Sequence, residues 1–160
     1  MKLTPAFNHT LCTVTPATAE QRSSSELLIS DTPTGKLLEG VILEAALLWR
    51  GHLLLFITDD VPFEEGLHIY LLDQELNTLD SAYMVAPYST GVFSNLVLEQ
   101  ENKVCFRFFE GIGYTLSLLP KESFALPFFS DPTSVWRSFK WKRWFRLDAQ
   151  PAPDDETPSH

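Results

Sequence analysis

The sequence predicts a mainly β protein, either an antiparallel β-sandwich or a curled, barrel-like meander of about seven to nine strands. Turn signals recur between residues 51 and 112 at steps of 11 to 13 residues. The runs between these turns have the length of strands and are rich in aromatic and branched aliphatic side chains. No amphipathic helix of about 10 to 15 residues separates the runs, so we expect hairpins with antiparallel pairing.

The expected strands follow one another along most of the chain. They are Glu26–Ser30, Val41–Trp49, His52–Thr58, Leu67–Leu72, Thr78–Val85, Val92–Leu98, Lys103–Phe109, Tyr114–Leu119 and Ser138–Leu147. Within His52–Thr58 both alternating sets of side chains are largely apolar, which is typical of an inner strand covered on both faces. Leu67–Leu72 and Lys103–Phe109 share this pattern. Either two sheets therefore pack together, or an added segment covers the second face.

The two ends of the chain differ in composition from its middle. Residues 1–25 are expected to form a polar, partly flexible leader, residues 26–147 a single β domain, and residues 148–160 a disordered, acidic, Pro-rich tail. The Asp131–Pro132 pair is typical of a helix start, so the sequence leaves room for one short helix over Pro132–Arg137. The last strand, Ser138–Leu147, is expected to carry a basic outer face.

Composition predicts the compartment and excludes some partners. The first residues contain no apolar run of the kind found in export signals, so we expect a cytoplasmic protein with Cys12 and Cys105 as free thiols. The most apolar window, Val41–Trp49, is far shorter than the roughly 20 residues of a membrane-spanning helix. A net charge of −9 argues against general nucleic-acid binding, because phosphate contacts need clustered cations.

The charge is distributed unevenly along the chain. Residues 51–102 contain no Lys or Arg, whereas five cations and no acid occur from Arg137 to Arg146. The acids of the cation-free segment are Asp59, Asp60, Glu64, Glu65, Asp73, Glu75, Asp80, Glu99 and Glu101. An acidic surface of this kind would attract a basic partner.

An acidic loop between two expected strands is the first candidate site. Its predicted partner-binding residues are Asp59, Asp60, Phe63, Glu64 and Glu65. Carboxylates around an exposed aromatic ring would anchor a basic protein. Four carboxylates would also suit Ca²⁺, but the alternating ligands of a calcium loop are absent and Pro62 stiffens the middle. An ordinary solvated hairpin loop is the third interpretation.

A stretch of interleaved cations and aromatic residues is the second candidate interface. Its members are Trp136, Lys140, Trp141, Lys142, Arg143 and Trp144. Period-2 alternation explains most of the aromatic residues as core, and the cations can pair with the acidic middle of the chain. The same mixture also occurs at protein interfaces and at surfaces that bind nucleic acid or lipid.

The sequence predicts no catalytic residue, metal site or cofactor. It lacks a serine on a sharp, glycine-flanked turn from strand to helix, and Cys105 is expected to be an inert thiol inside its strand. His52 and His68 lie on adjacent expected strands and would begin a metal site if they shared nearby rungs, but their spacing matches no metal motif.

The function that these patterns favour is non-catalytic binding of another protein through the acidic surface. A bacterial immunity or antitoxin-type inhibitor of a basic partner is its most concrete version. One alternative is a small-molecule-binding protein or hydrolase, which a pocket holding His52 or His68 beside a carboxylate would favour. The other is a structural subunit of a homo-oligomer, with a symmetric apolar interface.

Overall fold

The computed structural model describes residues 3–18, 21–61, 64–87, 89–124, 131–137 and 142–152. Across these ranges the chain forms thirteen strands and no helix, which confirms the all-β prediction. The strands lie in three sheets rather than in a closed barrel, and the pairings within the sheets are antiparallel.

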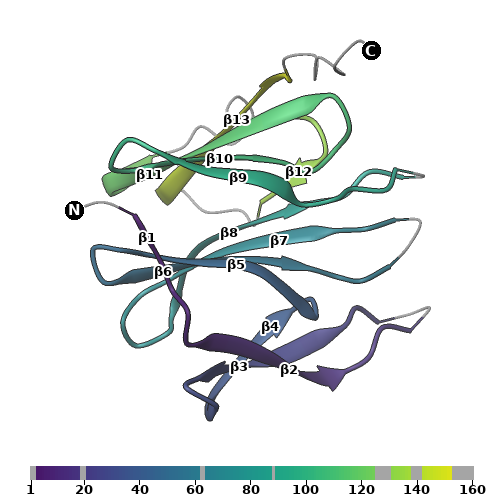
Figure 1. Ribbon diagram of the computed structural model, residues 1–160, viewed down its shortest axis with the longest axis vertical. Helices are drawn as coiled ribbons and strands as arrows, with labels where there is room; N and C mark the ends of the chain where they lie inside the picture. Colours follow the sequence, from purple (N-terminus) through teal and green to yellow (C-terminus); the bar gives the residue numbers. More distant parts are fainter. Residues whose placement is uncertain are drawn as a thin grey trace, which may run out of the picture.

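The three sheets are stacked, with a six-stranded sheet in the middle (Figure 1). This middle sheet has the order β1 (Thr4–Pro5), β5 (Ile42–Trp49), β6 (His52–Thr58), β7 (Leu67–Leu72), β8 (Thr78–Met84) and β12 (Val135–Trp136). The upper sheet in Figure 1 has the order β13 (Lys142–Pro151), β11 (Ile112–Phe124), β10 (Lys103–Arg107) and β9 (Ser94–Glu99). The lower sheet consists of β2 (His9–Thr15), β3 (Ser24–Ile29) and β4 (Thr32–Glu39).

The alternating side chains of β6 enter two separate cores. Leu54 and Phe56 belong to the core between the middle and upper sheets, whereas Leu53, Leu55 and Ile57 belong to the core between the middle and lower sheets. All five side chains are buried. Since burying each one contributes about 1.5–3 kcal/mol, the pattern of β6 requires a layer on either side. The predicted inner strand is thus confirmed.

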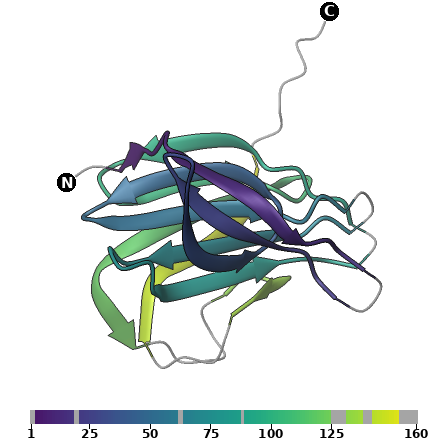
Figure 2. The ribbon, with the colours of Figure 1, turned by 90° about the horizontal axis from the view of Figure 1, so that it is seen from below.

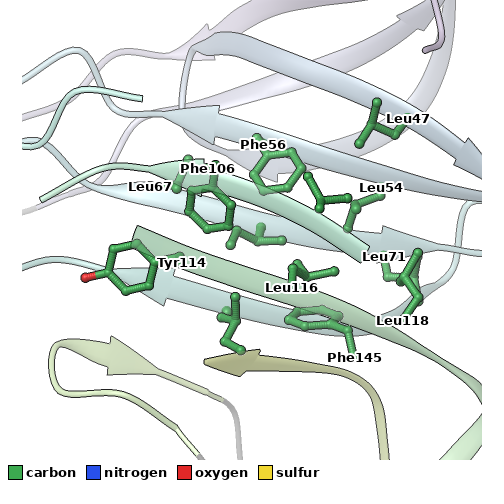
Figure 3. Close-up of a cluster of buried hydrophobic side chains, with 14 of the residues drawn as sticks. Leu47, Leu54, Phe56, Leu67, Leu71, Phe106, Tyr114, Leu116, Leu118 and Phe145 are labelled. Carbon is green, nitrogen blue, oxygen red and sulfur yellow. The ribbon is translucent and has the colours of Figure 1, made fainter. Parts of the chain in front are cut away.

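Aromatic packing joins the upper sheet to the middle sheet. The ring of Phe106 on β10 lies 5.3 Å from the ring of Phe56 on β6 and 5.5 Å from that of Tyr114 on β11. Leu116 of β11 and Phe145 of β13 extend the same cluster (Figure 3). Aromatic pairs of this kind add about 0.5–1.5 kcal/mol each beyond the area that they bury.

A fully buried carboxylate, Asp80 on β8, connects the middle sheet to β13. It accepts hydrogen bonds from the backbone N–H groups of Trp144 at 2.9 Å and Phe145 at 3.3 Å. It also forms ion pairs with Arg137 and with Arg143, whose Nη1 lies 3.5 Å away. Two cations of the C-terminal stretch, Arg137 and Arg143, thus pair with an acid from the middle of the chain.

The short helix expected over Pro132–Arg137 is not formed, and that option is wrong. The segment makes a turn in which Ser134 has a φ of 69°, and then the two-residue strand β12, which pairs with β8. Arg137 follows at once, with its Nε donating to the carbonyl of Ser81 at 3.0 Å. Contacts with β8 therefore outweigh the local preference of Asp131–Pro132 for a helix start.

The structure also moves the expected boundaries of the β domain. Two strands, β1 and β2, lie within the expected polar leader, and β4 begins at Thr32, directly after a tight turn at Ser30 and Asp31. The expected tail begins too early, because β13 continues to Pro151 and pairs there with Ile112 of β11. Residues 153–160 lie outside the described residues.

Replacing Asp80 with Asn should lower the free energy of unfolding by about 3–5 kcal/mol, because it leaves Arg137 buried beside a neutral group. Urea denaturation of the two proteins measures the difference. Asp148→Asn is the matched control, since it breaks the exposed Arg146–Asp148 pair and should cost at most about 1 kcal/mol. Equal losses in the two variants would contradict the connecting role of Asp80.

Candidate functional site

A cleft opens where the lower sheet stops covering the middle sheet. Ile57, His68, Tyr83 and Trp136 are register partners in one row across β6, β7, β8 and β12. Ile57 is buried under the lower sheet, whereas Trp136 at the other end of the row is 65% exposed. Figure 2, which views the molecule from the side of the lower sheet, shows the yellow-green β12 beside that sheet and not beneath it.

The cleft has a volume of about 950 Å³, which lies within the range of small-molecule sites. His68, Tyr70 and Tyr83 come from the middle sheet, and Glu39 comes from the end of β4 in the lower sheet. Arg22 lies in the connection between β2 and β3. The remaining lining residues are Glu64, Ser81, Ala82, Val85, Pro87, Thr133, Ser134, Trp136 and Arg137.

His68 is held in place by a buried carboxylate. Its Nε2 lies 2.7 Å from Oδ1 of Asp59, and its Nδ1 lies 3.7 Å from Oε2 of Glu39. The other oxygen of Asp59 accepts a hydrogen bond from the hydroxyl of Tyr83 at 3.1 Å. The rings of His68 and Tyr83 are stacked with centroids 4.3 Å apart. These contacts fix the orientation of the aromatic row.

Gly66 makes room for this arrangement. A Cβ at this position would lie 2.5 Å from Oδ2 of Asp59 and equally close to the Tyr83 ring and hydroxyl, which is closer than real Cβ contacts come. The absence of a side chain therefore lets Asp59 and Tyr83 meet.

Both tyrosines of the cleft are neutral phenols under ordinary conditions. Burial raises the pKa of Tyr70 and of Tyr83 well above the usual value near 10, and the Asp59 carboxylate raises that of Tyr83 further. Tyr70 also accepts a hydrogen bond from the backbone N–H of Glu39 at 3.0 Å, which ties the end of β4 to β7.

Arg22 lies at the mouth of the cleft. Its guanidinium carbon is 4.5 Å from the centroid of the Tyr83 ring, and its Nη1 is 3.3 Å from Oε2 of Glu39. Both charged side chains are about half exposed, at 58% for Arg22 and 49% for Glu39. The entrance therefore combines one cation, one carboxylate and an aromatic face.

The structure divides the predicted acidic loop into two pairs. Asp59 is buried against His68, and Glu65 accepts the backbone N–H groups of Asp59 at 2.7 Å and Asp60 at 2.8 Å. Burial raises the pKa of Glu65, although these two hydrogen bonds act in the opposite direction. Asp60 and Glu64 are exposed. Phe63 lies outside the described residues.

The second predicted interface is also divided. Trp136 is exposed at the cleft, and Trp144 is half-buried with its ring edge-on to His52 at 5.6 Å. Arg143 is buried against Asp80. Lys142 begins β13, and Lys140 and Trp141 lie outside the described residues.

The two strand histidines are far apart in register. His52 opens β6 and pairs with Trp49, whereas His68 pairs with Ile57 near the end of β6. Within the described ranges, no group of three or more His, Cys, Asp or Glu side chains is placed to hold a metal ion. The same ranges contain no helix that is long and apolar enough to cross a membrane.

Sequence reasoning missed Arg22, Glu39, Tyr70 and Tyr83 as site residues. One signal was present, because His68 and Tyr70 interrupt one face of an otherwise Leu- and Ile-rich strand. Comparison with known protein families, with characterised proteins and with solved structures found no match to this chain.

The free energy of unfolding should decrease at alkaline pH, because the pKa of Tyr83 is higher in the folded protein than in the unfolded chain. The unfolded chain ionises Tyr83 near pH 10, whereas the folded protein keeps it protonated to higher pH. The folded state then binds more protons, so this part of the stability is present below about pH 10 and is lost as the pH rises above it.

Tyr83→Phe should cost about 1 kcal/mol at neutral pH through the lost hydrogen bond to Asp59, and should flatten the alkaline loss. Urea denaturation at a series of pH values, followed together with tyrosinate absorbance, measures both effects. Identical alkaline slopes for the two proteins would refute the role given to Tyr83.

Proposed function

We propose that the protein is a non-catalytic binding protein that holds its ligand in the cleft between the lower sheet and β12. The observation that carries this proposal is the row His68–Tyr83–Trp136, which is held from below by Asp59 and exposed at its Trp136 end. An uncovered sheet face with no partner would be expected to carry mainly charged side chains. A row of oriented aromatic rings in a cleft is instead typical of a surface that binds another planar or ring-shaped group.

The position of His68 supports binding in preference to catalysis. Its side chain is only 3% exposed, its Nε2 is occupied by Asp59, and its Nδ1 faces Glu39. A general base must reach the proton that it removes, and this ring reaches Asp59 instead. Its contribution is to fix Asp59 and Tyr83 beneath the ligand.

Trp136→Ala should weaken ligand binding about tenfold, which corresponds to about 1.4 kcal/mol, because it removes one stacking surface. The free energy of unfolding should change by no more than about 0.5 kcal/mol, since Trp136 is 65% exposed. A fragment screen that follows the backbone amide NMR signals of β7 and β8 would identify ligands and measure their affinity for the parent protein and for the Trp136→Ala variant.

Phe7→Ala is the matched control for that screen, because Phe7 is an aromatic side chain that is 87% exposed and does not line the cleft. Fragments that bind the parent protein and the Trp136→Ala variant equally well would argue against the cleft as the binding site. A screen in which no fragment moves the β7 and β8 signals would have the same meaning.

A second candidate function is binding of a basic protein through the acidic surface, as in an immunity or antitoxin-type inhibitor. It is supported by the exposed carboxylates of Asp60 and Glu64 and by the absence of Lys and Arg from residues 51–102. Asp59 and Glu65 do not belong to that surface, because their carboxylates bind His68 and the loop backbone.

Reversing both exposed charges with Asp60→Lys and Glu64→Lys should reduce the association rate of such a partner at least about tenfold and weaken its salt dependence. Capture from lysate with a salt gradient would supply the partner, and surface plasmon resonance the rates. Glu99→Lys with Glu101→Lys changes the net charge equally at two other exposed positions. An equal loss in both double variants would show general attraction without a contact at the loop.

A further inference from the structure

We propose that the cleft binds an organic cation, a guanidinium or an ammonium group, in the place that the Arg22 side chain now occupies. This inference rests on the cleft being the ligand site, as proposed above, and adds the chemical class of the ligand. Arg22 is the internal example of that class. Its guanidinium group already makes the two contacts that define a cation site, with the Glu39 carboxylate at 3.3 Å and the Tyr83 ring at 4.5 Å.

The contacts of Arg22 are exchangeable. Its side chain is 58% exposed and the carboxylate of Glu39 is 49% exposed, so solvent screens their attraction. The structure also offers a second aromatic surface that Arg22 does not use. Trp136 is the register partner of Tyr83 on the neighbouring strand and is exposed. A bound cation would therefore find two rings within reach, where Arg22 contacts one.

A second hollow lies on the other side of Arg22. It has a volume of about 270 Å³ and shares Arg22, Glu64, Tyr83 and Val85 with the cleft. Displacement of Arg22 would join the two spaces. The smaller hollow is also lined by Ser23, whose Oγ is buried and has no hydrogen-bond partner among the described residues. A buried acceptor without a partner suits the N–H groups of a guanidinium or ammonium ion.

The charges around the cleft favour a cation over an anion. The floor strands β7 and β8 lie within residues 51–102, which contain no Lys or Arg. Of the two arginines that line the cleft, Arg137 is committed to Asp80 and Asp131, and Arg22 is paired with Glu39. Glu39 and Glu64 both present exposed carboxylates there. The net charge of −9 adds a field that concentrates cations near the surface.

The decisive experiment compares two ligands that differ in charge and hardly in shape. N-acetyl-arginine amide and its neutral counterpart N-acetyl-citrulline amide are titrated into the full chain, with N-acetyl-lysine amide as the ammonium probe. Amide NMR signals of β7, β8 and β12 are followed. We expect the arginine compound to shift these signals and to bind at least about tenfold more tightly than the citrulline compound.

Four variants test the displacement. Arg22→Gln should tighten binding about three- to tenfold, because it removes the internal competitor. Glu39→Gln and Trp136→Ala should each weaken binding about tenfold. Arg50→Asn is the matched control, since Arg50 lies over the ring of Trp49 at 4.8 Å, outside the cleft, and its loss should leave binding unchanged.

The outcomes separate this inference from the proposed function. If neutral fragments bind the cleft and neither cationic compound does, the cation inference is wrong and the binding function stands. If the Arg22→Gln variant binds the arginine compound more weakly than the parent protein does, the proposal that the ligand displaces the Arg22 side chain is wrong. If neither fragments nor cations bind, both proposals fail. If the arginine compound binds, an arginine-containing peptide is tested next. A peptide that binds at least about a hundredfold more tightly than the arginine compound identifies a protein as the source of the cation. A peptide that binds with the same affinity as the arginine compound identifies a small molecule as the source.

Discussion

The two-sided burial of β6 and β7 is the constraint on which the rest of this structure depends. Leucine, isoleucine and phenylalanine side chains project from both faces of these central strands, so each face requires a covering layer. The upper sheet covers one face with the cluster around Phe106. The lower sheet covers the other with only three strands, and its cover ends near β7. At that boundary the same sheet face changes from Leu55 and Ile57 to Tyr70 and His68. The cleft is therefore a consequence of unequal layers, and its polar-aromatic floor is the part of the face that the third layer leaves open.

A second constraint sets the outer border of the cleft. β12 contributes two residue pairs to the middle sheet, far too few to hold a strand by themselves. Its position is fixed by the next residue, Arg137, which is buried against Asp80 and donates to the backbone of β8. The same carboxylate accepts hydrogen bonds from backbone N–H groups of β13. One buried charge thus orients Trp136 at the cleft and joins two sheets, and Arg137 and Arg143 of the basic stretch are its partners.

The parts that the sequence predicts are those whose information is local. Alternation within β6, β7 and β10 predicts three strands, which are confirmed. The expected burial of both faces is confirmed for β6 and β7. It is wrong for β10, where Val104 and Phe106 enter the core but Lys103, Cys105 and Arg107 on the other face are only half-buried. β4 contains Pro33 and Gly35, which are typical of turns, and it forms because an edge strand tolerates them. β12 is set by a contact with Asp80 more than 50 residues earlier in the chain, which no local pattern contains. The site is less predictable still, since its members meet only through the register of β7, β8 and β12 and the placement of the lower sheet.

The exposure of Arg22 determines what an external cation must overcome. An exposed cation–π contact and a surface ion pair each contribute up to about 1 kcal/mol, so the internal occupant lowers the affinity of a competitor by at most about one to one and a half powers of ten. A ligand that also contacts Trp136 and satisfies Ser23 regains a free energy of that size. Arg22 contributes correspondingly little to the stability of the fold, in contrast to Arg137, whose charge is buried. The two arginines of the cleft therefore have opposite roles: one holds the sheet edge in place, and the other is bound weakly enough to be exchanged.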